Sequence, residues 1–454
     1  MDNINMSCCS HLIGKTFSVT TLGCRVNHYE AEAVAGALEN RGAVLVEASP
    51  DIVITVTCSI TSTADAKTRK ALRRARRDHP DSVIVACGCW AQAATESDAV
   101  SAGVDILVGN RVKHVIVDAL ERWYESPGIF IERKTDVVSS VEWDALSLDR
   151  PRMLTRAFIK VQDGCDRSCS YCAVPSLRGA HVSRDPDDVV REISRVASFG
   201  TKEAILTGIQ LGSYGLDGVT LAGLIRKISD AGAVTRLRLG SLEPFSVTEE
   251  LLQAASDSEI FCRHLHLPLQ SGDDGVLRAM RRGYDAADFI RIVDMARRYL
   301  GDDAHISTDL IVGFPGESDD AFERSLALLG EVGLGRIHVF PYSRRNGTDS
   351  SAMEGVPGNV LRERMNRALR VADGLLEAYA AKLIGREDRV LVEEVGERAS
   401  SGWNTRYVRV YARTESTGNC LIGNELVVRP KYSNGSILLC EGVDGEKIIM
   451  YPDE

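Results

Sequence analysis

The chain has 454 residues, of which 44% are hydrophobic and 26% are charged, close to the averages of soluble globular proteins. This composition excludes a disordered, collagen-like or short disulfide-stapled chain, and the length favours about three domains. Lys and Arg total 54 against 64 Asp and Glu, which gives a net charge of −10. An acidic total argues against nonspecific coating of DNA, but it leaves room for RNA binding through a local basic patch.

The sequence also indicates the compartment. No segment approaches the roughly 18 consecutive apolar residues of a membrane span, so we expect no membrane association. Residues 1–15 lack the charged start and long apolar core of a secretory signal and form an N-terminal tail. We therefore expect a cytoplasmic protein, in which the 12 cysteines stay reduced and serve as metal ligands, catalytic groups or core residues.

Residues 16–125 alternate short β-branched segments with amphipathic ones. Such alternation predicts βαβ units and a doubly wound parallel sheet. The predicted strands are 17–22, 43–47, 51–57, 82–86 and 105–108, and the predicted helices are 30–40, 64–77 and 112–124. Residues 126–150 lose this rhythm and are interpreted as a linker with some local structure.

Residues 151–385 resume the alternation and form the second predicted domain. The predicted strands are 157–161, 203–206, 236–239, 264–267, 305–312 and 336–340, and the helices are 187–199, 221–231, 248–256, 286–299, 319–332 and 361–383. Six βα units fit either an open sheet or a partial (β/α)6 barrel. Residues 386–454 contain short alternating segments at 390–394, 407–412, 426–429 and 437–440, which predict a small all-β barrel.

The strongest chemical signal is the compact motif Cys165-x3-Cys169-x2-Cys172, which follows a predicted strand. Three thiolates so close together can converge on one metal centre. A structural zinc site needs four ligands, and three thiolates on a four-iron cluster leave one iron open to a substrate or cofactor. A zinc site completed from elsewhere, or three ordinary core cysteines, are the simpler alternatives.

A second set comprises Cys24, Cys58 and Cys89, each of which closely follows a predicted strand of the first domain. The carboxyl ends of parallel strands share one edge of a sheet, where ligands bind, so we expect a second three-thiolate site there. Free cysteines are commonly buried, and this remains the alternative. Cys87 competes as the third ligand; we prefer Cys89 because it lies beyond the strand.

The compact motif resembles the cluster motif of radical S-adenosylmethionine (SAM) enzymes, and residues 17–443 resemble a methylthiotransferase within that superfamily. The similar segments are Thr21-Leu-Gly-Cys24-Arg-Val-Asn-His-Tyr-Glu30, Thr57-Cys58-Ser-Ile-Thr61, Gly88-Cys89-Trp-Ala-Gln92 and Val108-Gly-Asn110. Val56 departs from the family, which usually has Asn there. The C-terminal barrel is similar to a TRAM domain, an RNA-binding module.

Three further segments resemble the branch of the family that acts on N6-threonylcarbamoyladenosine (t6A) at position 37 of tRNA. They are Gly23-Cys-Arg-Val-Asn27, Lys160-Val-Gln-Asp-Gly-Cys165 and Leu206-Thr-Gly-Ile-Gln-Leu-Gly-Ser-Tyr-Gly215. The resemblance implies two [4Fe–4S] clusters, one on each cysteine set, and SAM. The first cluster and SAM would generate a radical that activates C2 of the adenine, and the second would carry the inserted sulfur. It also implies tRNA and an electron donor such as flavodoxin or ferredoxin as partners.

Polar residues at the strand ends of the second domain are candidate SAM contacts, because the carboxyl ends of strands form the functional rim of a βα barrel. The candidates are Gly208, Ser241, Glu243, His266 and Gln270. Loop capping, or a core position for His266, is the equally simple alternative. No catalytic residue beyond the cluster ligands is predicted.

Two elements are candidate RNA contacts. In the C-terminal barrel Tyr407, Arg409, Tyr411 and Arg413 alternate with apolar residues, so a strand would present rings and guanidinium groups on one face. In the first domain the basic segment 67–77, with Arg73, Arg74 and Arg77, could steer tRNA toward the cluster edge. Solvated faces are the alternative for both.

Three rival functions stay open at this point. Two use the same chemistry on another substrate, either isopentenyladenosine in tRNA or an aspartate of a ribosomal protein. The third is a non-catalytic, zinc-containing RNA-binding protein. The sequence does not identify the source of the inserted sulfur.

Overall fold

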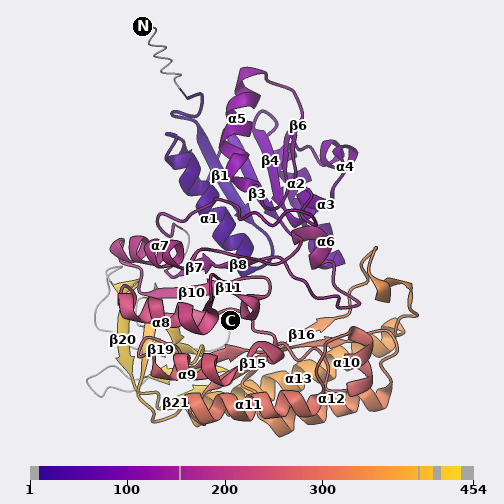
Figure 1. Ribbon diagram of the computed structural model, residues 1–454, viewed down its shortest axis with the longest axis vertical. Helices are drawn as coiled ribbons and strands as arrows, with labels where there is room; N and C mark the ends of the chain where they lie inside the picture. The colour runs from indigo at the N-terminus through magenta and orange to yellow at the C-terminus, as the bar shows by residue number, and fades with distance from the viewer. Residues whose placement is uncertain (1–9, 153–154, 397–398, 413–420, 441–454) are drawn as a thin grey trace. The chain divides into compact units, whose positions relative to one another are not determined.

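The computed structural model describes residues 10–152, 155–396, 399–412 and 421–440 (Figure 1). The chain divides into two compact units. The first contains the described residues up to Arg152, together with Asp163–Arg167 and Cys172–Val182, and the second contains the remaining described residues. Within these ranges no helix is long and apolar enough to span a bilayer.

The first unit is built on a parallel six-stranded sheet in the order β2-β1-β3-β4-β5-β6. Its strands are β1 (Thr16–Thr21), β2 (Val44–Leu45), β3 (Ile52–Thr57), β4 (Val83–Gly88), β5 (Ile106–Val108) and β6 (Ile131–Arg133). All residues of β3 and β4 are buried, as expected for central strands covered on both faces. The predicted doubly wound parallel sheet is confirmed, and β6 adds a strand inside the segment interpreted as a linker.

The helices of the first unit are α1 (Arg25–Glu39), α2 (Ser62–Asp78), α3 (Cys89–Ala93), α4 (Glu96–Ser101), η1 (Lys113–Val115), α5 (Ile116–Glu125) and α6 (Val174–Arg178). Of these, α1, α2, α3 and α5 contact the sheet, and α6 contacts α3 (Figure 1). Helix α1 begins five residues before the predicted start at Glu30, because Cys24 is its extended N-cap. Sequence periodicity missed α3, α4 and α6, since helices this short complete fewer than two turns.

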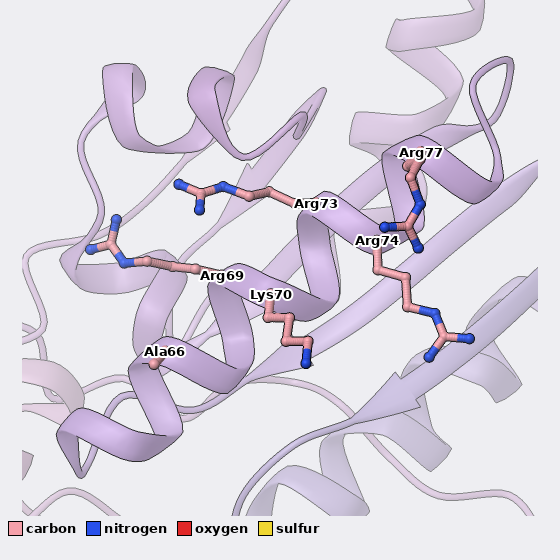
Figure 2. A pocket seen from close by; sticks show the side chains of 6 residues that line it. All are labelled: Ala66, Arg69, Lys70, Arg73, Arg74 and Arg77. Carbon is pink, nitrogen blue, oxygen red and sulfur yellow. The ribbon is translucent and has the colours of Figure 1, made fainter.

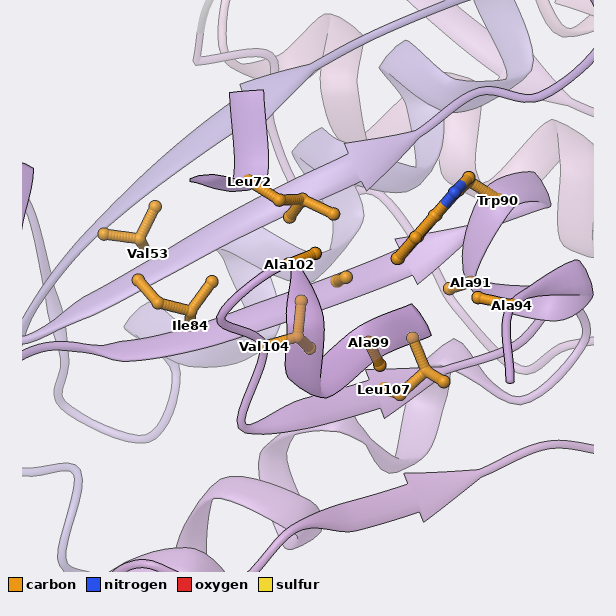
Figure 3. Close-up of a cluster of buried hydrophobic side chains, with 11 residues drawn as sticks. Val53, Leu72, Ile84, Trp90, Ala91, Ala94, Ala99, Ala102, Val104 and Leu107 are labelled. Atoms are coloured by element: carbon orange, nitrogen blue, oxygen red, sulfur yellow. The ribbon is translucent and has the colours of Figure 1, made fainter. Parts of the chain in front are cut away.

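One face of the sheet packs into an apolar core (Figure 3). Leu72 of α2 and Trp90 of α3 are buried against Val53 and Ile84 of the central strands. Leu72 and Thr68 are the only buried residues of α2, so the rest of that helix is free to carry charge. This packing fixes the start of α3, and with it Cys89, at the end of β4.

The second unit contains six parallel strands in chain order. Two three-stranded sheets, β13-β10-β7 and β14-β15-β16, are joined by bridges from Leu237 to Phe261 and from Ser241 to His266. The strands are β7 (Ala157–Lys160), β10 (Glu203–Thr207), β13 (Arg236–Leu239), β14 (His264–His266), β15 (His305–Val312) and β16 (Arg336–Pro341). The partial (β/α)6 barrel is therefore confirmed.

Helices and short elements connect these strands. The helices are α7 (Pro186–Ser198), α8 (Leu221–Ala231), α9 (Glu249–Asp257), α10 (Asp274–Met280), α11 (Ala286–Leu300), α12 (Asp319–Val332) and α13 (Gly358–Lys382). The short elements are β8 (Gln162–Asp163), β9 (Val182–Ser183), η2 (Leu211–Ser213), β11 (Gly215–Leu216), β12 (Val219–Thr220), η3 (Pro244–Ser246) and η4 (Asp349–Ala352). Helices α11, α12 and α13 pack in sequence along one another (Figure 1).

The C-terminal segment forms a six-stranded mixed sheet in the order β20-β17-β18-β19-β22-β21, which confirms the all-β prediction. Its strands are β17 (Asp388–Val395), β18 (Ser400–Asn404), β19 (Arg409–Ala412), β20 (Glu425–Val428), β21 (Tyr432–Asn434) and β22 (Ile437–Cys440). The pair β19–β22 is parallel and the other pairs are antiparallel.

This sheet docks onto the beginnings of the barrel strands, within the same unit. Glu203, the first residue of β10, is fully buried and pairs with Arg236 at 2.7 Å and Arg238 at 3.1 Å on β13. The same guanidinium groups donate to the backbone carbonyls of Trp403 and Asn404 in the C-terminal sheet. The amino ends of the barrel strands are thus closed by buried ionic contacts.

Candidate functional site

The cysteines of the second set follow three adjacent strands of the first unit. Cys24 follows β1 and caps α1, Cys58 follows β3 directly, and Cys89 opens α3 immediately after β4. The strand order reverses between β1 and β3, which is where doubly wound sheets open a ligand crevice. Cys24 and Cys58 therefore lie at the switch point, and Cys89 lies one strand further along.

Glycines before two of these cysteines allow the loops to approach closely. Gly23 has φ +108°, and a Cβ there would lie 2.9 Å from the Cys58 sulfur. Gly88 has φ +102°, and a Cβ there would lie 2.8 Å from the carbonyl oxygen of Thr57. Any larger residue at Gly23 would push the loop of Cys24 away from Cys58, so this loop is built for contact between the two.

The thiols influence one another electrostatically. Burial, together with the nearby Cys89 and Cys24, raises the pKa of Cys58 to about 11. Cys24 is exposed, whereas Cys58 and Cys89 are buried. A thiol with so high a pKa is protonated at neutral pH unless a metal takes the proton's place.

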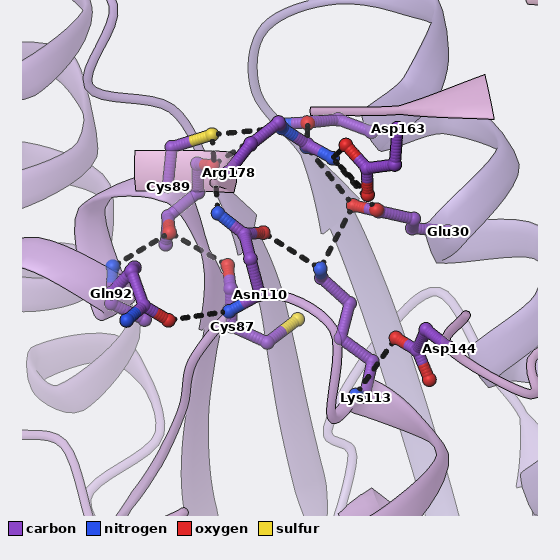
Figure 4. Close-up of polar contacts among 12 residues, drawn as sticks. Glu30, Cys87, Cys89, Gln92, Asn110, Lys113, Asp144, Asp163 and Arg178 are labelled. Carbon is purple, nitrogen blue, oxygen red and sulfur yellow. Dashed lines mark hydrogen bonds and ion pairs between the residues drawn. The ribbon is translucent and has the colours of Figure 1, made fainter. Parts of the chain in front are cut away.

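Arg178 of α6 lies beside Cys89 in the first unit (Figure 4). Its Nε donates to the Cys89 sulfur at 3.3 Å, and its terminal nitrogens reach Glu30 and Asp163 at 3.0 and 3.2 Å. Burial alone would lower the pKa of Arg178, but the charges of Cys89, Glu30 and Asp163 raise it well above its ordinary value. A fixed positive charge thus lies against one of the three thiols.

A second buried cation extends this polar network. The ammonium group of Lys113 contacts Asn110 Oδ1 at 2.8 Å and Glu30 at 3.2 Å, and both ionic side chains are fully buried. Asn110 in turn donates to the Cys89 sulfur at 3.6 Å. Cys87 lies inside β4, where burial raises the pKa of its thiol to about 12.

The cysteines of the compact motif are divided between the two units: Cys165 and Cys172 belong to the first and Cys169 to the second. The backbone N–H of Arg167 donates to the Cys165 sulfur at 3.4 Å, and that of Val174 donates to the Cys172 sulfur at 3.5 Å. All three are partly exposed. Loop N–H groups that face a sulfur favour its anionic form.

Within the second unit, Arg282 lies beside Cys169. Its guanidinium donates to the Cys169 sulfur at 3.4 Å and to the Tyr171 hydroxyl at 3.3 Å, and it pairs with Glu243. The Arg282 side chain is only 4% exposed. This arginine therefore links a cysteine of the compact motif to one of the SAM candidates.

The other SAM candidates lie near the carboxyl ends of the barrel strands, as predicted. Gly208 follows β10, and a Cβ there would lie 2.7 Å from Gln162 Oε1. Ser241 follows β13 and is bridged to His266 at the end of β14. His266 contacts Ser307 at 2.9 Å and Asp309 at 3.2 Å.

Gln270 has φ +70°, an uncommon conformation for a residue with a side chain. Its backbone is bridged to Leu310 of β15, and its N–H donates to the Asp309 carbonyl at 2.9 Å. The strained loop is therefore held in place by the neighbouring strand.

The basic segment forms the exposed side of α2 (Figure 2). A surface pocket is lined by Ala66, Arg69, Lys70, Arg73, Arg74 and Arg77. Arg69 and Arg76 are half-buried and bind carboxylates of their own unit.

The other cations of α2 are more exposed. Arg74 and Arg77 share Asp78, and Lys70 and Arg73 make no ion pair with any described residue. We define the cationic stripe as Lys67, Lys70, Arg73, Arg74 and Arg77, all exposed.

The predicted alternation in the C-terminal sheet is present, because Val408, Val410 and Ala412 are buried while Tyr411 is exposed. Two of the other candidates contact residues of the protein itself and do not form an open face for RNA. Tyr407 stacks on Trp403 with the ring centroids 4.8 Å apart and packs beside His264 of β14. Arg409 pairs with Glu393 at 2.8 Å and Glu394 at 2.6 Å. Arg413 lies outside the described residues.

The described residues contain no group of three or more Cys, His, Asp or Glu side chains arranged to hold a metal ion. The donors nevertheless fit an iron–sulfur centre, because soft thiolates at a crevice, with N–H groups and an arginine directed at sulfur, are its usual surroundings. The six ligand assignments stay predictions.

Sequence reasoning missed Arg178 and Arg282. Arg178 is the last residue of α6, the short helix that follows the compact motif, and Arg282 lies just after α10. Nothing in the sequence distinguishes them from surface arginines, because their contacts with Cys89 and Cys169 arise only on folding. The one sequence signal for such a role is an arginine in a segment that is otherwise apolar and predicted to be buried.

Two family models match this chain. Residues 159–329 match the Radical SAM superfamily, and residues 16–109 match the uncharacterized protein family UPF0004. Among solved structures, the radical S-adenosylmethionine methyltransferase TsrM from Kitasatospora setae is similar, with a TM-score of 0.56 and 15% identity. That match covers 75% of this chain and 74% of TsrM. Residues 159–329 thus form a radical SAM domain.

Curated relatives narrow the class. Two proteins named threonylcarbamoyladenosine tRNA methylthiotransferase are similar: that of Bacillus subtilis is 33% identical, covering 87% of this chain and 90% of the relative. That of Thermotoga maritima is 35% identical, covering 87% and 91%. A tRNA-2-methylthio-N(6)-dimethylallyladenosine synthase of Thermobifida fusca is 34% identical, covering 84% and 78%. This chain belongs to the radical SAM tRNA methylthiotransferase family.

Proposed function

We propose that this enzyme adds a methylthio group to C2 of t6A at position 37 of tRNA. The observation that carries this proposal is the near full-length match to relatives named for that substrate, 33% to 35% identical over 87% of this chain. The two cysteine sets supply the ligands that a two-cluster reaction needs. The substrate of the Thermobifida fusca relative is the second candidate, because its identity is similar.

The cofactors are SAM and two [4Fe–4S] clusters. Cys165, Cys169 and Cys172 would hold the cluster that activates SAM, and Cys24, Cys58 and Cys89 would hold the auxiliary cluster. Together these groups supply the radical and the sulfur that an inert C–H position requires. The chain's own contribution is to bind and orient the reactants.

Residues at the carboxyl ends of the barrel strands would bind SAM. The Glu243 carboxylate, which pairs with Arg282, would accept a hydrogen bond from the amino or ribose groups of SAM. Gly208 keeps the end of β10 open, while Ser241, His266 and Gln270 offer polar groups on the next strands. The Asp309 contact orients the His266 ring.

Two surfaces would contact the tRNA. The cationic stripe of α2 would bind phosphates, with Arg73, Arg74 and Arg77 as its central members. In the C-terminal sheet Tyr411 offers an exposed ring, with the Arg409 guanidinium 5.9 Å from its centroid. Tyr407 would act by holding Trp403 and the sheet in place. Arg413 stays a predicted RNA contact.

The remaining partners follow from the chemistry. SAM cleavage consumes an electron, so we propose flavodoxin or ferredoxin as the donor. We also propose a cytoplasmic location, which a tRNA substrate and reduced cysteines support.

Nucleoside analysis tests the substrate. Total tRNA from cells with and without the gene is digested and analysed by mass spectrometry. We expect loss of 2-methylthio-t6A in the deletion and its return with the wild-type gene. Loss of the methylthio form of isopentenyladenosine instead would transfer the proposal to that substrate. Unchanged nucleosides would contradict it.

Iron analysis tests the cofactors. The cysteines of one set, Cys165/Cys169/Cys172 or Cys24/Cys58/Cys89, are replaced by Ala, and the protein is purified anaerobically. Each triple substitution should remove about half of the bound iron, since each set would hold one four-iron cluster. A colourless wild-type protein that contains zinc would contradict the enzyme and favour a zinc-containing RNA-binding protein.

A further inference from the structure

Arg178 is a fully buried arginine whose donors are all directed at polar groups. NH1 reaches Glu30 and Asp163, and NH2 reaches Asn27 Oδ1 at 2.8 Å and Glu30 at 3.3 Å. The remaining donor, Nε, is 3.3 Å from the sulfur of Cys89. Charged side chains are almost never fully buried without such pairing, so these contacts are what allows the Arg178 guanidinium to be buried.

The choice of a sulfur as the fourth partner is informative. A neutral thiol is a weak acceptor, and a buried guanidinium gains little from it. A metal-bound thiolate carries negative charge, and a hydrogen bond from a charged donor to it is roughly twice as strong as a neutral one. Cys89 also accepts from Asn110 at 3.6 Å, so two donors are directed at one sulfur (Figure 4).

The other buried cations of the unit do not share this arrangement. Lys113 contacts Asn110 and Glu30. Arg111 donates to the carbonyl oxygens of Ser140 and Ala180. In the part of the unit that the structure describes, Arg178 is therefore the cation that touches a sulfur of the auxiliary set.

We propose that Arg178 sets the reduction potential of the auxiliary iron–sulfur centre by donating a charged hydrogen bond to the Cys89 sulfur. One-electron reduction adds one negative charge to the cluster, and a guanidinium beside a ligand sulfur stabilises that charge. Hydrogen bonds to the sulfurs and local net charge are established determinants of cluster potentials. The effect is strong here because the pair lies in a buried, weakly screened site. This inference rests on the proposed two-cluster function.

Potentiometry of the isolated auxiliary cluster tests the proposal. The full-length chain with Cys165, Cys169 and Cys172 replaced by Ala retains only that cluster, and dithionite supplies the electron. We expect R178Q to lower the midpoint potential by at least 59 mV, a tenfold change in a one-electron equilibrium, and R178K to lower it less. R111K is the matched control, for which we expect the one-electron equilibrium constant to change by less than threefold. Bound iron with an unchanged midpoint in R178Q and R178K would overturn the proposal.

A second measurement needs no substitution of Arg178. The same protein is labelled with ¹⁵N-arginine, and the reduced cluster is examined by pulsed electron paramagnetic resonance. A ¹⁵N coupling is expected because Nε lies 3.3 Å from a ligand sulfur. Absence of the coupling would overturn the proposal even if R178Q failed to fold. Absence of iron from this protein would instead overturn the two-cluster function, so the two failures are distinguishable.

Discussion

Cys87 and Cys89 lie near each other at the end of β4, and the structure separates them. Cys87 is inside the strand, fully buried, and paired in register with Val56 and Val108. Cys89 lies beyond the strand and accepts hydrogen bonds from Arg178 and Asn110. A ligand needs a free approach to the metal, which the start of α3 offers and the strand interior does not.

We expect C89A to lose the auxiliary cluster and C87A to retain it, because only Cys89 lies at the crevice edge. The measurement is iron per chain after anaerobic purification, with the absorbance of the cluster as a second readout. C87A also serves as the control for the loss of one buried thiol. Iron loss in C87A with retention in C89A would reverse the assignment.

Arg282 provides a second test at the residue scale. R282M would leave Glu243 without its cation, and breaking one buried ion pair costs about 3–5 kcal/mol. We expect a lower thermal midpoint and a loss of at least tenfold in reductive SAM cleavage. R281M is the matched control, because Arg281 is 51% exposed and pairs with Asp349 at the surface. Equal effects of the two substitutions would argue against a role at the site.

The positions of the cysteines just after the strands could be predicted from the sequence, because spacing and position after a strand are local properties. Arg178 and Arg282 could not, since a buried arginine is recognised only by its partners. The same holds for Tyr407, whose position in an alternating strand predicted an exposed ring. The ring is instead enclosed by Trp403 and His264, which come from other elements.

Among the elements, the predictions succeeded where the hydrophobic period runs over several turns or strand residues. The bounds of α8 (Leu221–Ala231), α12 (Asp319–Val332), β13 (Arg236–Leu239) and β15 (His305–Val312) agree with expectation. The short elements α3, β6 and β21 were missed, because so few residues show no period and depend on tertiary packing. Strand β6 is part of the local structure within the segment interpreted as a linker, and its pairing with β5 defines it.

The cationic stripe of α2 supports a prediction for RNA binding. Replacing Arg73, Arg74 and Arg77 by Gln should weaken tRNA binding and reduce its salt slope by about 2 to 3, since each phosphate contact contributes 0.7 to 0.9. The measurement is the dissociation constant at several salt concentrations. The control replaces the exposed Arg291, Arg298 and Arg370 of α11 and α13, which should leave the slope unchanged. An unchanged slope in the α2 variant would exclude phosphate binding there.

At the scale of the whole molecule, the C-terminal sheet is a structural part of the second unit. Arg236 and Arg238 connect Glu203 to backbone carbonyls of the sheet, and Arg406 bridges Asp303 and Asp388 at 2.6 and 2.8 Å. His305 stacks on Tyr379 with the centroids 4.5 Å apart. The sequence predicted each part, but not the joint, because its residues are scattered over the whole second half of the chain.

Glu203 gives this joint a pH dependence. Although burial alone would raise its pKa, Arg238, Arg236 and Arg156 lower it from 4.5 to about 2. A depressed carboxyl pKa stabilises the folded state above pH 4.5, and this contribution is lost as the pH falls from 4.5 toward 2. The shift corresponds to about 3 kcal/mol at neutral pH.

We therefore expect E203Q to lower the stability of the second unit markedly at pH 7 and by less at pH 3. Chemical unfolding at both pH values, followed through the C-terminal sheet by tryptophan fluorescence, measures this difference. D187N on the surface of α7 is the control, since that carboxylate is 63% exposed and pairs with Lys227. A difference between wild type and E203Q that does not change with pH would contradict the assignment.

The buried joint between the barrel and the C-terminal sheet also fixes a distance that bears on the substrate. The sheet cannot slide along the barrel without leaving Glu203 or the arginines buried and unpaired, so its distance from the carboxyl ends of the strands is fixed. The longest barrel strand, β15, has 8 residues and spans ~26 Å at ~3.3 Å per residue. If Tyr411 holds the RNA as proposed, the RNA must bridge a comparable length to bring a base to the proposed SAM site. A folded anticodon arm would meet that requirement and a free nucleoside would not, so we expect the joint to favour a large RNA substrate.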